Sequence, residues 1–267
     1  MKLHQGIRRW AGGIATAVLC MGLTGCAKRP PDMPAYDPLE SMNRHIYNFN
    51  EDLDRAVIGP VSRGYAAITP HAVRLGVGNF FSNAAYPGVV LNDFLQGKGA
   101  QGLQDSCRFL VNTTLGLLGF FNPASSMGLP DHNEDFGQTL GVWGSGPGAY
   151  LMLPVLGPSD GRDVTSLPVG VATDVATYAS PSWPVSIGLV SLRIINTRAE
   201  LEKAVQIRET AAIDPYLFTR SAYLQQRYNA VYDGHPPQSD SMDDQLFKEL
   251  EENSPAPEKN GNNEKNQ

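Results

Sequence analysis

Charged residues and cysteines are scarce in this sequence. Lys, Arg, Asp and Glu together make up 18% of its 267 residues, whereas about 25% is usual in soluble domains. The formal net charge is −6, and no basic domain is present that could neutralise the phosphates of a nucleic acid, which excludes that class of partner. The 27 Gly and 20 Pro exclude a coiled coil, and the 42% of hydrophobic residues excludes a fully disordered chain.

The N-terminal segment has the pattern of an export signal. Three basic residues precede an apolar stretch over residues 10–23, which is too short to be a membrane-spanning helix. Residues 23–26 read Leu-Thr-Gly-Cys and resemble the lipobox of bacterial lipoproteins, in which the cysteine is acylated and becomes the first residue of the mature protein. We therefore predict a signal peptide at 1–25 and a lipid anchor at Cys26.

The anchor sets the expected compartment and the ends of the mature chain. Ala27 stands where enteric lipoproteins that stay at the inner membrane carry aspartate, so we expect the outer membrane, on its periplasmic side. Residues 26–36 are a proline-rich tether, and the acidic residues 234–267 are typical of a disordered tail. Cys107 would then have no disulfide partner, and its apolar neighbours predict a buried structural thiol.

Helical patterns fill the part of the chain between the tether and the tail. An Asp-Pro-Leu-Glu motif at 37–40 and an Asp-Pro pair at 214–215 are strong helix starts. After the first start, apolar residues recur at spacings of three and four up to Val57, and residues 197–207 form another amphipathic helix. Long alternating strands are missing, although residues 149–156 could be extended. We expect a mainly α domain over 37–233 with little or no sheet.

The middle of the chain contains three long segments without a charged side chain, at 109–130, 136–159 and 175–192. Polar residues, glycines and prolines interrupt the first two, so their backbone could not face lipid as one continuous helix. One interpretation is a soluble helical core with glycine-rich loops. The interpretation that we favour, given the lipid anchor, is a body partly sunk in one membrane leaflet.

Motifs that carry enzyme chemistry are weak or missing. The histidines of the body, His45, His71 and His132, are scattered and lack metal-ligand spacing. The Gly-Lys-Gly at 97–99 lacks the other residues of a phosphate-binding loop. Ser126 lies in a segment that only loosely resembles a lipase elbow. We expect no cofactor, no metal and no catalytic residue, and so not an enzyme.

Several blocks of sequence resemble the MlaA (VacJ) outer-membrane lipoproteins over about residues 37–228. These blocks, in chain order, are Asp37-Pro38-Leu39-Glu40, Asn43-Arg44, Phe49-Asn50, Asp54, Asn79-Phe80-Phe81-Ser82-Asn83, Asn92, Leu95-Gln96-Gly97, Arg108-Phe109-Leu110-Val111-Asn112-Thr113-Thr114, Asp135-Phe136-Gly137-Gln138-Thr139-Leu140-Gly141, 150–154, Gly157-Pro158-Ser159 and Arg162-Asp163.

The resemblance implies a specific architecture and function. It implies a ring-like helical body in the inner leaflet of the outer membrane, surrounding an amphipathic channel and associated with trimeric porins. Such a protein removes phospholipids from the outer leaflet and passes them to a soluble periplasmic carrier, which maintains lipid asymmetry. Two other functions stay open: a phospholipid-modifying envelope enzyme, and a structural or adhesive envelope lipoprotein.

Two groups of residues are candidate parts of the lipid path. Asn79, Phe80 and Phe81 match a family block near the channel wall, and we expect them to pack against the path or gate it; plain core packing is the alternative. The second group is expected to form a flexible loop at the channel mouth, because glycine gives backbone freedom. It consists of Gly137, Gly141, Gly144, Gly146 and Gly148.

Overall fold

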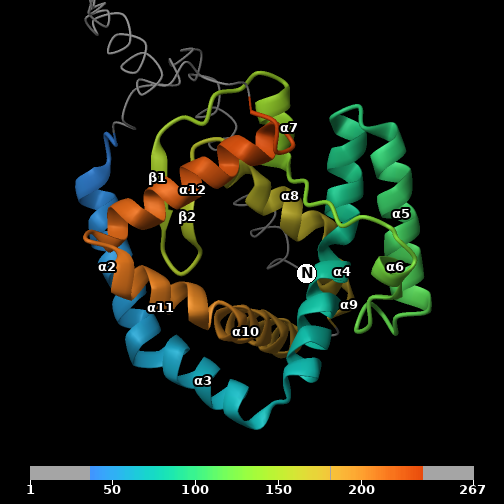
Figure 1. Ribbon diagram of the computed structural model, residues 1–267, viewed down its shortest axis with the longest axis horizontal. Coiled ribbons are helices and arrows are strands. Elements are labelled where there is room, and N and C mark those ends of the chain that lie inside the picture. Colours follow the sequence, from blue (N-terminus) through green and yellow to red (C-terminus); the bar gives the residue numbers. More distant parts are fainter. Residues whose placement is uncertain (1–36, 181, 237–267) are drawn as a thin grey trace, which may run out of the picture.

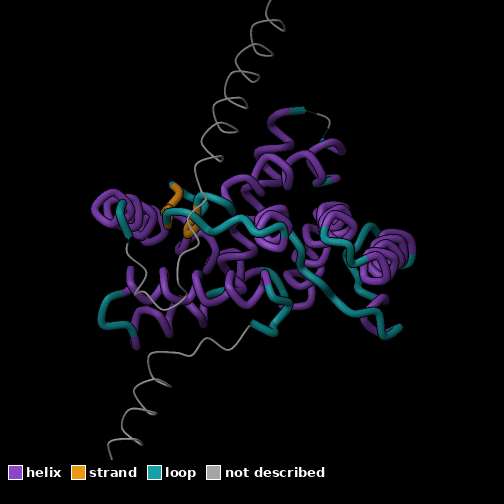
Figure 2. The backbone as a smooth tube through the Cα atoms, turned by 90° about the horizontal axis from the view of Figure 1, so that it is seen from above, coloured by secondary structure: helices purple, strands orange, loops and turns teal. Residues whose placement is uncertain are grey.

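The helices of this protein form a ring. The computed structural model describes residues 37–180 and 182–236. Viewed down the shortest axis of the molecule, the helices follow one another around a central opening in the ribbon (Figure 1), and the edge-on view shows the same helices as a broad layer (Figure 2). The anchor at Cys26, the tether at 26–36 and nearly all of the predicted tail lie outside the described residues.

The secondary structure is almost entirely helical, as predicted. The helices are α2 (Glu40–Leu53), α3 (Gly59–Ile68), α4 (His71–Leu95), α5 (Gly99–Thr114), α6 (Pro123–Ser126), α7 (Phe136–Val142), α8 (Ser166–Thr173), α9 (Val175–Ala179), α10 (Trp183–Glu200), α11 (Glu202–Ala211) and α12 (Pro215–Val231), with a π-helical segment η2 (Asp54–Ile58) and a 3₁₀ turn η3 (Asp163–Thr165). Strands β1 (Tyr150–Leu153) and β2 (Gly157–Asp160) form one antiparallel hairpin, so the extended run expected near 149–156 is confirmed.

The two helix starts predicted from Asp-Pro pairs are confirmed within a residue or two. Asp214 caps α12 by accepting hydrogen bonds from the backbone N–H groups of Tyr216 and Leu217 at 3.0 and 3.1 Å. Asp37 accepts from the N–H of Leu39 at 3.0 Å, just before α2 begins. The predicted helix at 197–207 is instead divided at Leu201, where α10 ends and α11 begins.

The junction between α2, the hairpin and α12 is built from polar side chains and tyrosines. Asn43 is fully buried; its amide donates to the carbonyl of Tyr150 at 2.9 Å and its oxygen accepts from the N–H of Met152 at 2.8 Å. The rings of Tyr47 and Tyr150 pack edge-on against Tyr216. These contacts fasten the first helix to the last one through the hairpin.

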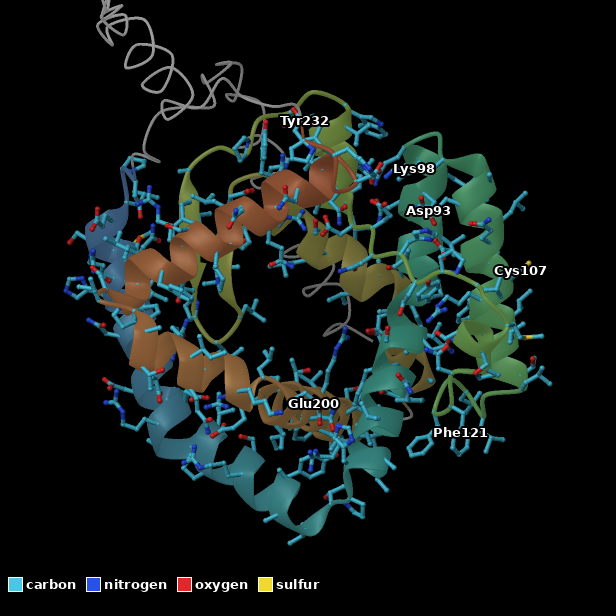
Figure 3. The ribbon with its side chains drawn as sticks, in the orientation of Figure 1. Asp93, Lys98, Cys107, Phe121, Glu200 and Tyr232 are labelled. Carbon is cyan, nitrogen blue, oxygen red and sulfur yellow. The ribbon has the colours of Figure 1, made fainter. Side chains whose placement is uncertain are left out.

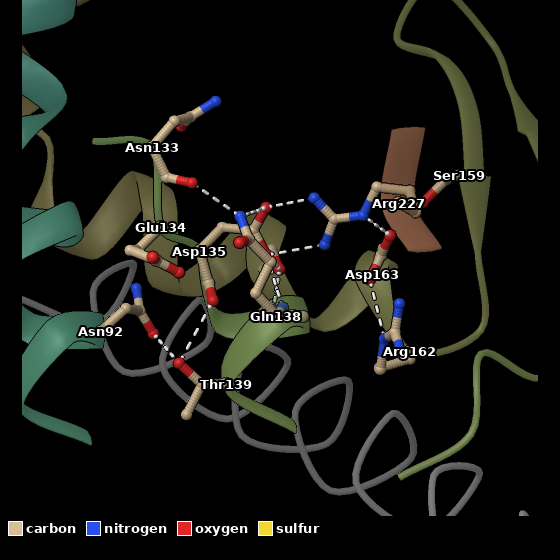
Figure 4. Close-up of polar contacts among 12 residues, drawn as sticks. Asn92, Asn133, Glu134, Asp135, Gln138, Thr139, Ser159, Arg162, Asp163 and Arg227 are labelled. Atoms are coloured by element: carbon tan, nitrogen blue, oxygen red, sulfur yellow. Dashed lines mark hydrogen bonds and ion pairs between the residues drawn. The ribbon is translucent and has the colours of Figure 1, made fainter. Parts of the chain in front are cut away.

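Ion pairs close the ring on the side of α7. Arg227 of α12 donates to both carboxylate oxygens of Asp135, the N-cap of α7, at 2.6 and 2.9 Å, and it also pairs with Asp163 of η3 (Figure 4). Arg162 donates to the same Asp163 at 3.0 Å. Helix α12 is thus joined to α7 and η3 by charges of which Arg227 and Asp163 are nearly buried and Asp135 is partly exposed.

Burial is inverted relative to an ordinary soluble protein. Among the described residues, the buried set contains more polar and charged side chains than hydrophobic ones, and many large hydrophobic side chains are exposed. Helix α5 is an example: Asp105 and Arg108 are buried, whereas Leu103 and Leu110 are 64% and 58% exposed. The apolar side of α5 points away from the ring, as the position of Cys107 between these leucines shows (Figure 3).

This inversion overturns the prediction for Cys107. The thiol is exposed and points outward from α5 (Figure 3). Its apolar neighbours predicted burial because an apolar helix face normally covers a core, but here that face is the outer one. Within the described ranges, none of the helices has the length and the apolar character needed to cross a membrane.

Candidate functional site

A cavity of about 540 Å³ lies between α4, the segment 131–133 and α10. This volume lies within the range of ligand pockets, which is about 300–1,000 Å³. Two kinds of wall face each other. One wall is formed by small and apolar side chains of α4, and the other by polar side chains of α10 and of the segment before α7. The lining residues are Gly78, Phe81, Ser82, Ala85, Tyr86, Val89, Asp131, His132, Asn133, Arg193, Asn196 and Thr197.

Close packing behind α4 holds its apolar wall in place. A methyl group added at Gly88 would lie 2.6 Å from the hydroxyl oxygen of Thr173 in α8, and one added at Gly76 would lie 2.3 Å from the ring of Phe120. Real side-chain carbons do not approach so closely, so these glycines are needed for the approach of neighbouring segments. Helix α4 therefore presents the face with Phe81 and Val89 to the cavity at a fixed depth.

The segment 131–133 is held by buried charges of α5. Arg108, which is 2% exposed, donates to the carbonyl of Leu129 at 2.7 Å and pairs with Asp131 at 3.1 Å. Asp105 lies 2.9 Å from the ring nitrogen Nδ1 of His132 and accepts from the Tyr86 hydroxyl at 2.9 Å. Buried side chains of α5 therefore support the part of the polar wall that segment 131–133 contributes.

A second buried carboxylate extends this network along α4. Asp93 is fully buried and accepts from Gln101 at 2.7 Å. Burial, together with the neighbouring Asp105 carboxylate, raises the pKa of Asp93 to about 7. Beyond it, Lys98 donates to Glu134 at 2.9 Å and pairs with Asp233, near the end of α4 that faces α7 (Figure 3).

Arg193 places a cation on the opposite wall of the cavity. Its Nη1 donates to Asp174 at 2.8 Å, its side chain is 46% exposed, and its guanidinium carbon lies 5.9 Å from the centre of the Phe81 ring. Asn196 beside it is buried and accepts from the Tyr65 hydroxyl at 2.9 Å, which fixes α10 against α3. The cavity thus offers one arginine within reach of an apolar surface.

The predicted residues Asn79, Phe80 and Phe81 lie on α4 at this site, but they face different surroundings. Phe81 is 5% exposed and lines the cavity, with Phe80 packed edge-on against it at 5.2 Å between ring centres. Asn79 donates weakly to the carbonyl of Phe120 at 3.4 Å and lines an adjacent pocket of about 20 Å³. That pocket has room for about one water molecule. Their role in a lipid path stays a prediction.

The five predicted loop glycines fall into two environments. Gly137 and Gly141 lie inside α7, where an added methyl group would lie 2.2 Å from a carboxylate oxygen of Asp163 and 2.8 Å from Val231. Only Gly144, Gly146 and Gly148 lie in the loop between α7 and β1. The structure therefore differs from the expectation for the first two glycines, which serve close packing of α7.

The residues considered for enzyme chemistry are not brought together. Ser126 ends the short helix α6, His45 lies within α2, and His71 is the first residue of α4. Over the described part of the chain, no cluster of three or more potential ligands could hold a metal ion. Sequence reasoning assigned no role to Arg108, Asp131 or Arg193, although Arg108 belongs to one of the blocks that resemble the family. A signal for Arg193 was available, because it is the first charge after the uncharged segment 175–192.

Comparison with known proteins gives the same family that the sequence resembles. The family model for the MlaA lipoprotein matches residues 35–230. The "Intermembrane phospholipid transport system lipoprotein MlaA" of Shigella flexneri is 36% identical over 217 residues, which cover 79% of this chain and 85% of that protein. Its counterpart in Haemophilus influenzae is 31% identical over 252 residues, which cover 89% and 98%.

A solved structure agrees with the ring-shaped fold. It comes from work on the structural basis for maintenance of bacterial outer membrane lipid asymmetry, and the two folds superpose with a TM-score of 0.65 at 32% sequence identity. The match covers 73% of this chain and 99% of that one. A family model over most of the described body, together with relatives and a fold of this similarity, leads to one assignment: the chain belongs to the MlaA lipoprotein family.

Proposed function

We propose that this protein is a lipid-anchored component of phospholipid transport, which takes phospholipids from the outer leaflet of the outer membrane and passes them to a periplasmic carrier. Acylated Cys26 would hold the ring on the periplasmic side of that membrane. The family relationship and the names of the relatives support the transport of phospholipids.

The cavity with one apolar and one polar wall is the observation that carries the proposal. Moving a charged headgroup through hydrocarbon costs at least about 2.5 kcal/mol per charge. A cavity that gives the headgroup polar partners lowers this barrier, while Phe81, Ala85 and Val89 provide an apolar surface for the acyl chains. A transporter needs both surfaces at once, whereas a structural lipoprotein needs neither.

The apolar exterior supports a position partly within one leaflet. Leu115, Leu117 and Leu118, in the turn after α5, are all about two-thirds exposed, and Phe121 points outward beside them (Figure 3). Large exposed apolar patches indicate an interaction surface, and an acylated protein has lipid beside it. Part of this exterior would contact the trimeric porins that the family resemblance implies as partners.

Phe80 and Phe81 test the role of the α4 wall. We expect Phe80→Ala to let phospholipid accumulate in the outer leaflet of living cells while the protein is still present at its normal level, because Phe81 loses the ring that supports it. Phe94→Ala, a change of the same size on an exposed part of α4, serves as the control. Normal surface phospholipid in the Phe80→Ala strain, with normal abundance, would show that this pair has no gating role.

Lipid analysis separates transport from the two alternatives. The purified full-length protein should carry phospholipid, and incubation with phospholipid should yield no lyso-products by mass spectrometry. Lyso-product formation would favour an enzyme, and protein free of lipid would favour a structural or adhesive lipoprotein. Crosslinking in cells to a porin and to a soluble periplasmic protein tests the proposed partners.

A further inference from the structure

Arg193 has hydrogen-bonding capacity that the described protein does not use. One nitrogen, Nη1, donates to Asp174 at 2.8 Å, and no described residue accepts from Nε or Nη2 of the same guanidinium. An arginine fork with free donors matches the paired oxygens of a phosphate. It is also the only arginine in the described lining of the cavity.

The neighbouring charges explain why a ligand would choose this arginine. Asp131, in the segment before α7, is paired with Arg108, and His132 is bonded to Asp105. Arg193 has a single carboxylate partner, Asp174, whose other oxygen is occupied in capping α9 through the N–H of Ala176 at 2.8 Å. The arginine is therefore the most available positive charge in the lining.

The apolar wall adds the second half of a recognition site. The Arg193 guanidinium lies 5.9 Å from the ring centre of Phe81, so a phosphate held by Arg193 would sit at the edge of the apolar face of α4. Ala85 and Val89 continue that face along the cavity. A free phosphate ion would use only the cation, whereas a lipid would use the cation and the apolar wall together.

We propose that Arg193 binds the phosphodiester of a phospholipid in this cavity, with the acyl chains along α4, and that Asp174 competes with the phosphate for the guanidinium. This assignment rests on the proposed function and names the contact that the headgroup makes. Competition by Asp174 keeps the affinity moderate, so that a lipid can leave as well as enter.

Substitution of both partners tests the competition. Arg193→Gln should weaken the binding of phosphatidylglycerol about tenfold or more, since it removes a charge-assisted contact. Asp174→Asn should strengthen that binding, because asparagine can still cap α9 but no longer neutralises Arg193. The double variant should bind like Arg193→Gln alone. Arg55→Gln, on the exposed segment η2, is the control for the loss of a positive charge outside the cavity.

The assay is native mass spectrometry of the full-length protein in detergent, with three probes: dioleoyl phosphatidylglycerol, dioleoylglycerol and inorganic phosphate. We expect the order of affinity phospholipid, then diacylglycerol, then phosphate. We expect Arg193→Gln to weaken the binding of the phospholipid and of inorganic phosphate and to leave the binding of diacylglycerol unchanged. Because that variant leaves Asp174 without its partner, Arg193→Lys, which keeps the charge but lacks the fork, is measured alongside it and should bind at an intermediate level.

The possible results separate a failure of the proposed function from a failure of the Arg193 assignment. If the wild-type protein binds neither lipid, the proposed function itself is wrong. If the wild-type protein binds phospholipid and both variants, Arg193→Gln and Asp174→Asn, bind it as tightly as the wild type does, the function stands and the assignment of Arg193 is wrong. If inorganic phosphate binds as tightly as the phospholipid, the site recognises a free ion and the lipid assignment is overturned.

Discussion

Removal of Arg227 is the sharpest test of how the ring is held together. Arg227→Gln removes the guanidinium between Asp135 and Asp163, whose side chains are 34% and 9% exposed. Breaking a buried pair by removing one partner costs about 3–5 kcal/mol. Asp163 keeps Arg162 at 3.0 Å and the Tyr223 hydroxyl at 2.6 Å, so we expect the lower end, about 3 kcal/mol.

The assay is thermal unfolding of the purified protein in detergent, followed by circular dichroism. For a body of this size, 1 kcal/mol shifts Tm by about 2–4 °C, so Arg227→Gln should lower Tm by about 6–12 °C. The control is Arg55→Gln, which breaks a pair of 79% and 77% exposed side chains and should cause little or no change. Equal Tm shifts in the two variants would refute the view that buried ion pairs close the ring.

The pH dependence of the same pair gives an independent check. Burial alone would raise the pKa of Asp135, but its bonds to Arg227 outweigh this and lower the pKa below the ordinary value. The stabilisation is therefore complete above the unfolded pKa of about 4 and is lost as the pH falls through the lowered value. The part of the stability difference between wild type and Arg227→Gln that comes from Asp135 should stay constant from pH 8 down to about 4 and shrink only below that.

Three further predictions address packing, titration and exposure. Gly76→Ala should destabilise the protein by about 1–3 kcal/mol, because its methyl group meets the Phe120 ring at 2.3 Å, whereas Gly64→Ala, with open space around it, should stabilise α3 by about 0.4–1 kcal/mol; chemical denaturation measures both. The pKa of Asp93 is raised to about 7, so the protonated carboxyl stabilises the fold in acid, and this stabilisation is lost as the pH rises through 7. Asp93→Asn resembles the protonated form and should remove this loss. A variant whose stability between pH 5.5 and 8.5 follows the same curve as that of the wild type would contradict this reasoning. Cys107 on the outer face of α5 should react with a membrane-permeant maleimide in proteoliposomes and resist an impermeant one, and rapid labelling by both would show that lipid does not cover that face.

Local chemistry made part of the fold predictable. Asp37 and Asp214 mark helix starts because a carboxylate followed by proline satisfies the first N–H groups and sets the backbone angle within a few residues. The path of the chain after the first helix was harder to predict from the sequence. The chain runs on from α2 through η2 into α3, and Pro60, which has no N–H to donate, lies just after the π-helical segment and within α3.

Long-range packing explains what the sequence could not predict. Gly137 and Gly141 belong to α7 because Asp163 and Val231, which are distant in the sequence, press against them; their spacing alone is equally typical of a loop. Cys107 was predicted to be buried because, in a protein surrounded by water, a thiol with apolar neighbours normally lies in the core. The expectation is reversed for a helix whose apolar side is the outer one. The sequence singled out Phe81 as a candidate for the lipid path. Its partner Arg193 lies over a hundred residues further along the chain, and no local pattern connects the two.

The inverted burial ties the stability of the ring to its proposed task. With many leucines on the outside, joints such as that of Arg227 with Asp135 are made by hydrogen bonds and ion pairs, which are stronger where water is excluded. In a soluble protein such pairs can often be replaced by apolar side chains without loss. A buried charge also supports the polar wall here: Arg108 fastens segment 131–133 and fixes Asp131 at the cavity. An apolar replacement of Arg108 would therefore leave Asp131 unpaired and segment 131–133 unsupported at the cavity, even where the helices still packed.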